Sequence, residues 1–443
     1  MIWVRWLLLL VVGAAASAFC PSGCTCNEDM PEVQCVGVTL NMVPMLLNPA
    51  LKNLNLAHNR LRTINQELLF YENLEKLDLS HNLLSGLSHE SFVAQRELRQ
   101  LRLSHNNISS VEKTSFIGLS KLSLLDLSSN ALRDIPPDTL SHTPSLQVLL
   151  LSHNRLHSLA VPTFRGLVNL ERLDISENYF RQLPGTAFTE LSELKSLDVS
   201  RNRLVEVLEG DLPLPRLTSL SLDGNSIENI DAAALHYLEA LEVLSLSNNL
   251  LSTVPTSALS ALVSVESLSL SRNNITELSA GAFVGLRRLT TLEISRCPML
   301  SSVSAAALVH CSKLRTLTLS HNPLLRSLPA TLFQPLADLQ ALDLRGNSLE
   351  TVEGGSAPWD ALQALDLRDN SLVCNCSLRW LAELLAQPNT TILDVQCAMP
   401  DNLRGVHLSR SVAYTSCLAF RHCDEDTISV ATEVDHDSQS RQS

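Results

Sequence analysis

Cysteine and histidine are the residues of this chain whose types and spacing could support chemistry. Eight of the 11 cysteines form two clusters, one near each end: Cys20, Cys24, Cys26 and Cys35, then Cys374, Cys376, Cys397 and Cys417. Such short spacings can hold zinc or form disulfides, and spacing alone cannot choose among the three pairings that four cysteines permit. The choice between zinc and disulfides depends on whether the chain is exported, because disulfides persist in oxidising compartments.

The N-terminus has the pattern of a secretory signal peptide. Arg5 precedes an apolar run from Trp6 to Val12, and small residues follow up to Ala18. This stretch is shorter than the roughly 20 residues that a membrane span needs. We predict cleavage after Ala18 and secretion to the extracellular space or extracellular matrix, so disulfides are favoured over zinc. No later stretch is long and apolar enough for a transmembrane segment.

A row of histidines, His58, His81 and His105, recurs at one position of a repeat, and His153 follows. Stacked imidazoles would disfavour one another's protonation, so a metal ladder or a pH sensor is one interpretation. No carboxylate regularly accompanies them, which favours a solvated corner instead. The sequence has no G-x-S-x-G elbow, H-E-x-x-H helix or phosphate-cradling glycine loop, so neither an enzyme nor a cofactor is expected.

These residues must be positioned by a repeat of about 24 residues with the register L-x-x-L-x-L-x-x-N-x-L. Its key positions are Asn59, Asn82, Asn106, Asn130, Asn154, Asn178, Asn202, Asn225, Asn249, Asn273, Cys297, Asn322, Asn347 and Asn370. The leucine alternation predicts a short strand in each repeat. A second apolar spine is predicted ten residues past most key positions: Phe92, Phe116, Leu140, Phe164, Phe188, Leu212, Leu235, Leu259 and Phe283. One repeat cannot bury its leucines alone, so the repeats must stack as a solenoid, and the asparagines must bond loop backbones.

The repeat and its cysteine-rich flanks resemble extracellular leucine-rich repeat proteins of the chondroadherin-like, Slit-like and Tsukushi-like kind. The resemblance implies an α/β leucine-rich repeat solenoid, a curved horseshoe with a parallel β-sheet on its concave face and disulfide-bonded caps at both ends. It also implies the pairings Cys20–Cys26, Cys24–Cys35, Cys374–Cys397 and Cys376–Cys417. The expected segments are a signal peptide (1–18), an N-terminal cap (19–50), fourteen repeats (51–373), a C-terminal cap (374–420) and an acidic disordered tail (421–443).

Three cysteines lie outside these clusters. Cys297 takes the asparagine position of its repeat, and Cys311 replaces the leucine of a Gly-Leu pair, so we expect a small core hydrophobe there. A bridge between Cys297 and Cys311 is the alternative. Cys423 leaves an odd count, which suggests a free thiol or a possible dimer through Cys423.

Sequons predict N-glycosylation at Asn107, Asn274 and Asn389. Asn375 also begins a sequon, but it lies between two cysteines expected to be bridged, and it is less favoured.

In a curved stack of this kind, the residues two, four and six positions before each key residue line the concave sheet. The candidate ligand contacts are Lys76, Asp78, Arg102, Leu124, Asp126, Val148, Leu150, Arg172 and Asp174. Among them Leu124, Val148 and Leu150 form an exposed apolar cluster within mixed charge, as interface centres prefer. From Ser196 to Ser271 the same positions are mostly serine, which suits an extended or glycan-bearing ligand or is consensus filler.

The net charge of −13 and the pI near 5.5 argue against nucleic acid or an anionic membrane as partner. The resemblance implies a secreted binding protein whose partner is an extracellular protein: a matrix component such as collagen, a growth factor or a receptor. The alternatives are a cell-surface adhesion or receptor ectodomain, and pattern recognition in innate immunity.

Overall fold

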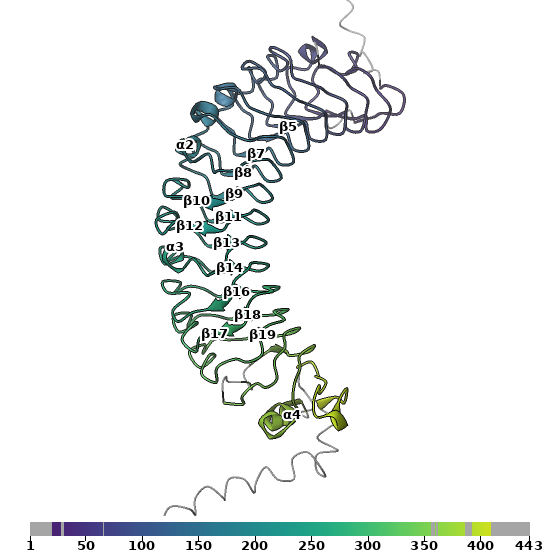
Figure 1. The fold of residues 1–443 in the computed structure, drawn as a ribbon. Helices are drawn as coiled ribbons and strands as arrows, with labels where there is room; N and C mark the ends of the chain where they lie inside the picture. The colour runs from purple at the N-terminus through teal and green to yellow at the C-terminus, as the bar shows by residue number, and fades with distance from the viewer. Residues whose placement is uncertain are drawn as a thin grey trace, which may run out of the picture. The chain divides into compact units, whose positions relative to one another are not determined.

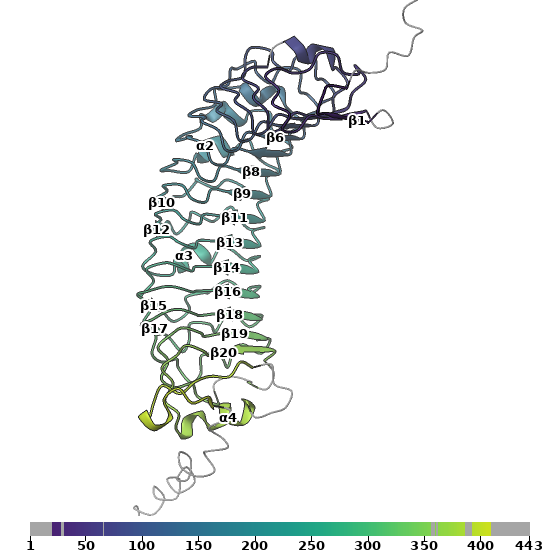
Figure 2. The same cartoon turned by 90° about the vertical axis from the view of Figure 1, so that its right-hand side faces the viewer.

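The computed structural model describes residues 20–27, 31–64, 66–355, 359, 362–385 and 392–408. The predicted signal peptide (1–18) and acidic tail (421–443) therefore lie outside the described residues. The chain forms two units, Met1–Asn225 and Ser226–Ser443. In both units the strands follow one another along one side (Figures 1 and 2).

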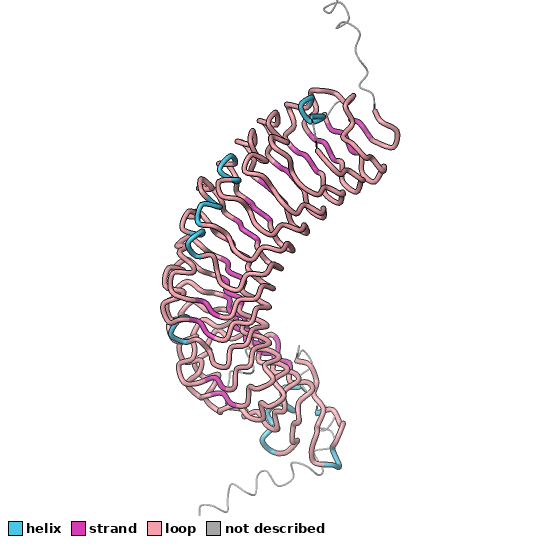
Figure 3. The backbone as a smooth tube through the Cα atoms, turned by 45° about the horizontal axis from the view of Figure 1, so that its top comes forward, coloured by secondary structure: helices cyan, strands magenta, loops and turns pink. Residues whose placement is uncertain are grey.

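The first unit is a stack of short strands, and in the three-residue strands β2–β9 and β11 the central side chain is buried in the core. Its strands are β1 (Thr25–Asn27), β2 (Glu32–Gln34), β3 (Asn53–Asn55), β4 (Lys76–Asp78), β5 (Gln100–Arg102), β6 (Leu124–Asp126), β7 (Val148–Leu150), β8 (Arg172–Asp174), β9 (Ser196–Asp198), β10 (Glu206–Val207) and β11 (Ser219–Ser221). The hairpin β1–β2 is antiparallel, and from β2 to β9 and on to β11 each strand pairs in parallel with the next. The short helices η1 (Gln66–Phe70), η2 (Thr139–His142), η3 (Val161–Phe164) and α2 (Gly185–Phe188) lie on the side away from these strands (Figure 3).

The second unit repeats this arrangement and ends in a helical cap. Its strands are β12 (Asn229–Ile230), β13 (Val243–Ser245), β14 (Ser267–Ser269), β15 (Glu277–Leu278), β16 (Thr291–Glu293), β17 (Ser302–Val303), β18 (Thr316–Thr318), β19 (Ala341–Asp343) and β20 (Ala364–Asp366). The order β13–β14–β16–β18–β19–β20 is parallel throughout, and β15 pairs with β17. The helices are α3 (Thr256–Leu259), η5 (Cys376–Leu378), α4 (Arg379–Leu385) and η6 (Asp401–Leu403). Trp380 of α4 donates a hydrogen bond to the carbonyl of Val352 (3.0 Å) and so holds the cap to the last repeats.

The core consists of the repeat leucines and the predicted apolar spine. All nine predicted spine residues are buried. Phe164 and Phe188, one repeat apart, stack with ring centroids 6.4 Å apart. The predicted solenoid of parallel strands is therefore confirmed.

Each key asparagine hydrogen-bonds its own turn to the preceding one, and we call this series of hydrogen bonds the asparagine ladder. The Nδ2 atom of Asn154 donates to the carbonyls of Leu127 (2.9 Å) and Leu151 (3.0 Å), and its Oδ1 accepts from the backbone N–H of Leu132 (3.0 Å). These are loop groups inside the coil that would otherwise be unpaired, so the asparagine is required for hydrogen bonding rather than for its volume. The Asn273 side chain makes the equivalent three bonds in the second unit.

The residue before each key position turns a tight corner with positive φ. This holds for His58, His81, His105 and His153, whose φ values lie between 53° and 57°. The left-handed region is costly for residues other than glycine, and the ladder of bonds on either side of the corner holds it there.

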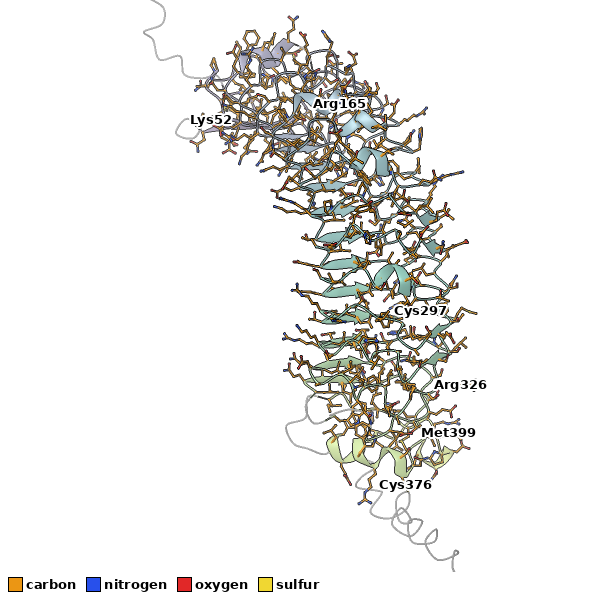
Figure 4. The ribbon with its side chains drawn as sticks, turned by 90° about the vertical axis from the view of Figure 1, so that its left-hand side faces the viewer. Lys52, Arg165, Cys297, Arg326, Cys376 and Met399 are labelled. Atoms are coloured by element: carbon orange, nitrogen blue, oxygen red, sulfur yellow. A yellow bond between two sulfur atoms is a disulfide. The ribbon has the colours of Figure 1, made fainter. Side chains whose placement is uncertain are left out.

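Disulfides lie near both ends of the described chain. The structure contains Cys20–Cys26, Cys24–Cys35 and Cys374–Cys397, the pairings that the resemblance implied. Cys376, whose position is labelled in Figure 4, is also disulfide-bonded, and Cys417 lies outside the described residues. None of the helices in the described ranges is long and apolar enough to cross a membrane.

Candidate ligand-binding face

We call the outward side chains of β2–β8 the first strand face. On each strand the first and third residues point outward while the central one is buried, as in Lys76, Leu77 and Asp78 of β4. Because neighbouring strands pair in exact register, equivalent side chains form columns that run across the strands. All nine predicted contact residues belong to this face.

The structure brings the three predicted apolar residues of the face together. Leu124 pairs with Val148, and Leu150 pairs with Asp126 on one side and Asp174 on the other. All three apolar side chains are half-buried rather than fully exposed, because strands about 4.8 Å apart cover one another's flanks. The result is a small apolar platform with carboxylates at its edge.

Some of the charged residues around this platform are engaged locally. Asp126 accepts hydrogen bonds from the backbone N–H (3.0 Å) and the hydroxyl (2.6 Å) of Ser128. Asp174 accepts the equivalent two bonds from Ser176. Arg172 differs: it is exposed and makes no ion pair within the part of the chain that the structure describes. Arg172 is therefore the charge of this region that is most available to a partner.

A polar hollow of about 240 Å³ adjoins the platform across β2–β5. The predicted residues Lys76, Asp78 and Arg102 line it, and Arg102 Nη1 lies 3.8 Å from Asp78 Oδ2. Residues that the sequence analysis did not select also line it: Glu32, Gln34, Asn53, Asn55 and Gln100.

Three of these missed residues, Asn53, Asn55 and Gln100, could have been found from the same register. Asn53 and Asn55 stand six and four positions before Asn59, and β2 extends the face because the cap hairpin pairs with β3. Within the described ranges, neither the Asn53 nor the Gln100 side chain forms a hydrogen bond. Such free amides offer both donors and acceptors to a polar ligand.

The histidine row is a real stack. The ring centroids of His58 and His81 are 4.0 Å apart and those of His81 and His105 are 4.2 Å apart, with the rings within 10° of parallel. Burial, then the neighbouring His105 and His58, lower the pKa of His81 from its ordinary 6.5, against an opposing effect of Asp78. His153 lies outside the stack and bonds Glu177 Oε2 (2.9 Å). No cluster of metal-binding side chains was found in the described segments.

The two internal thiols are buried and unbridged. Cys297 and Cys311 form no disulfide with each other, so the alternative of a bridge between them is wrong for this structure. Burial raises the pKa of both thiols, that of Cys311 to about 12. Protonated, inaccessible thiols are poor nucleophiles, so both cysteines behave as core residues. Cys423 lies outside the described residues.

The glycosylation candidates divide by position. Asn107 and Asn274 are both exposed and follow a key asparagine directly, so attachment there would leave the ladder intact. Asn389 lies outside the described residues. Asn375 Oδ1 accepts the backbone N–H of Ser377 (3.0 Å) at the start of η5. Glycosylation at Asn107, Asn274 and Asn389 stays a prediction.

Parallel strands on one side, an asparagine ladder at each corner and disulfides near both ends define a capped leucine-rich repeat solenoid. The chain belongs to the leucine-rich repeat family, whose model, described as leucine rich repeat, matches residues 49–108, 96–156, 144–204, 215–275, 263–324 and 312–372.

Its similar proteins include extracellular leucine-rich repeat proteins, as the cysteine-rich flanks led us to expect. Human Tsukushi is 33% identical over 108 residues, covering 22% of this chain and 31% of that protein. Mouse oligodendrocyte-myelin glycoprotein is 35% identical over 80 residues, 18% of each chain. Human amphoterin-induced protein 2 is 32% identical over 95 residues, covering 21% of this chain and 18% of that protein. The matched segments thus span about a third or less of these relatives.

Solved structures share the fold. A leucine-rich repeat protein of Leptospira interrogans has a TM-score of 0.64 at 24% identity, covering 81% of this chain and 94% of that chain. A chain of the Drosophila Toll–Spatzle complex has a TM-score of 0.61 at 22% identity, covering 81% and 60%.

Proposed function

We propose that this chain is a secreted extracellular binding protein that recognises another protein through the first strand face. The partner would be a matrix component, a growth factor or a receptor. The observation that carries the proposal is the apolar platform of Leu124, Val148 and Leu150 between the polar hollow and Arg172. These side chains point away from the leucine core, so folding does not require them to be apolar. An apolar centre within a polar rim is the composition of protein interfaces.

Secretion is supported by the signal-peptide pattern at 1–18 and by the disulfides at both ends, which persist outside the cytosol. Binding without catalysis is supported by the face itself. The carboxylates of Asp78, Asp126 and Asp174 are held by neighbouring serines or by Arg102, and the hollow is open rather than closed around reacting groups.

The proposal is tested by proximity labelling with the mature chain on an extracellular proteome. Three proteins are compared: the wild type, Leu150→Asp, and the control Val243→Asp, which changes an exposed apolar residue on a strand of the second unit. We expect partners that the wild type and Val243→Asp label and that Leu150→Asp loses, since a charge placed in an apolar platform must be desolvated on binding. An unchanged partner set with folded Leu150→Asp would refute the proposed face.

Localisation is tested separately. Untagged protein should be recovered from conditioned medium rather than from the cell pellet. Complete retention on cells would favour the adhesion or receptor alternative.

A further inference from the structure

The first unit has a second candidate interaction surface, formed by exposed apolar side chains that lie outside the first strand face. The side chains of Met42, Met45, Leu46, Leu69 and Phe70 are 59%, 52%, 74%, 43% and 57% exposed. Met45, Leu69 and Phe70, with Ile64 and Val93, line a groove of about 920 Å³, which we call the outer groove. A groove lined by exposed apolar side chains is characteristic of interaction sites in soluble proteins.

The exposure of Leu69 and Phe70 follows from a one-residue shift of the apolar spine in the first repeat. The buried spine residue here is Leu68, nine positions past Asn59, whereas the nine predicted spine residues stand ten positions past their key residues. Leu68 and Tyr71 are buried, and the two residues between them are turned outward by η1. No packing requirement accounts for leucine and phenylalanine at these two positions.

The groove is held in shape by Tyr71. Its hydroxyl donates to the carbonyl of Pro44 and accepts from the backbone N–H of Leu47 (3.4 Å). The segment that carries Met45 and Leu46 is thereby fixed beside η1, which carries Phe70. A preformed groove needs little ordering on binding, which favours affinity.

The rim of the groove is acidic. Among the described residues that line it are Glu67 and Glu90 and no lysine or arginine. Among these described lining residues the basic group is His89, whose Nε2 lies 3.4 Å from Glu90 Oε1 and whose Nδ1 lies 2.6 Å from Thr114 Oγ1. The two glutamates outnumber this histidine, so the rim is negative.

This charge decides between the possible occupants. In a symmetric dimer the same patch meets itself, so Glu67 and Glu90 would face the carboxylates of a second copy. A basic partner would neutralise them instead. The described lining residues come from loops and η1 and offer no free strand edge. Backbone pairing is therefore not available there, and recognition must act through side chains.

We propose that the outer groove binds an amphipathic helical segment of a partner protein, with apolar side chains in the groove and lysine or arginine beside Glu67 and Glu90. This site is independent of the first strand face, and both can be occupied by different partners.

The test uses a synthetic 16-residue amphipathic helix with leucines at i, i+3, i+4 and i+7 and flanking lysines, labelled for fluorescence anisotropy. The comparison peptide has glutamates in place of the lysines. We expect saturable binding of the lysine peptide to the full chain, at least ~10-fold tighter than the glutamate peptide, about 1.4 kcal/mol. Phe70→Glu should abolish it, and Glu67→Lys with Glu90→Lys should reverse the peptide preference.

Two matched controls keep the result interpretable. Val168→Glu replaces another exposed apolar residue of the same unit (53% exposed) and should leave binding unchanged, as should Leu150→Asp on the strand face. Equal binding of both peptides, or binding that survives Phe70→Glu, would overturn the proposal. So would a wild-type dimer in sedimentation that Phe70→Glu dissolves, because the occupant would then be a second copy.

Discussion

The strand faces of the two units are built on the same three-residue strands but carry different side chains. The first face presents long amide, charged and apolar residues, whereas the second, on β13, β14, β16, β18, β19 and β20, presents mostly serine, threonine and alanine. In the second unit these short groups form local hydrogen bonds: the Ser269 hydroxyl accepts from the Ser247 hydroxyl (2.7 Å) and donates to the Glu293 carboxylate (3.0 Å). The buried ladder is common to both units, so the outward side chains are free to differ.

The contrast extends to two hollows of similar size. The one in the first unit, about 240 Å³, is lined by Asn53 and Gln100, whose amides are free within the described residues. The one in the second unit, about 250 Å³, is lined by Asp343 and Asp366 among alanines and threonines. Burial raises the pKa of Asp366, but its bonds to Arg368 outweigh this and lower it overall. In the second hollow the Asp366 carboxylate is thus already bonded to Arg368, whereas in the first hollow the Asn53 and Gln100 amides can bond a ligand.

The largest effect should come from the shared ladder. Asn154→Ala removes three bonds from buried groups and is expected to cost about 3 kcal/mol of unfolding free energy. Asn273→Ala in the second unit should cost the same within ~1 kcal/mol, since its bonds are equivalent. Denaturant unfolding measures both. A much smaller loss for Asn273→Ala would show that the two units do not share one stabilising framework.

An exchange of surface character should affect binding but not folding. Leu124→Ser with Leu150→Ser gives the first face the character of the second and should weaken binding to the partner captured by the wild type by at least ~10-fold, about 1.4 kcal/mol. Val243→Ser is the control and should bind normally. Titration calorimetry decides the matter, and full affinity in the double variant would mean that the platform is not a contact.

A smaller effect is expected at the one ladder position that is not asparagine. The Cys297 thiol lies 3.7 Å from the Leu270 carbonyl and 3.8 Å from that of Ser295, both weak contacts. Cys297→Asn should restore the usual bonds and stabilise the chain by about 1 kcal/mol, while Cys297→Ala should not. Thermal unfolding of the three proteins tests this, and destabilisation by asparagine would show that the turn before Pro298 cannot accept it.

The smallest effect is a difference in pH dependence. The folded pKa of His81 is below its unfolded value of 6.5, so its neutral form is favoured and stability declines as the pH falls through 6.5. His81→Gln should flatten this decline slightly between pH 7 and 5. Asp366 acts at lower pH: its depressed pKa contributes stability above 3.8 that is lost on further acidification. Melting temperatures across pH 3–8 check both, and an unchanged slope in His81→Gln would remove the histidine stack as the cause.

The sequence predicted those features that the ladder and the core impose in every repeat. The strand positions, the spine from Phe92 to Phe283 and the asparagine corners each recur because one physical requirement recurs. The proximity of His58, His81 and His105 was predictable for the same reason.

What escaped prediction depends on departures from the period. The hollow was missed because Glu32 and Gln34 belong to the cap, which has no repeat register, and only pairing with β3 places them on the face. The outer groove was missed because the first repeat buries Leu68 instead of Leu69, and this shift leaves Leu69 and Phe70 facing outward. The half-burial of Leu150 depends on how closely neighbouring strands cover it, and a residue pattern carries no such distance.

The hairpin that precedes the repeats also limits where an expression fragment of this protein can begin. β2 covers the edge of β3 with parallel pairing, and Tyr71 binds the segment around Pro44. Removing residues 19–50 as if they were a separate domain would leave β3 with an unpaired edge, the kind of surface through which chains join into aggregates. An expression fragment should therefore begin before Cys20, and the cap and the first repeats should be treated as one indivisible folding unit.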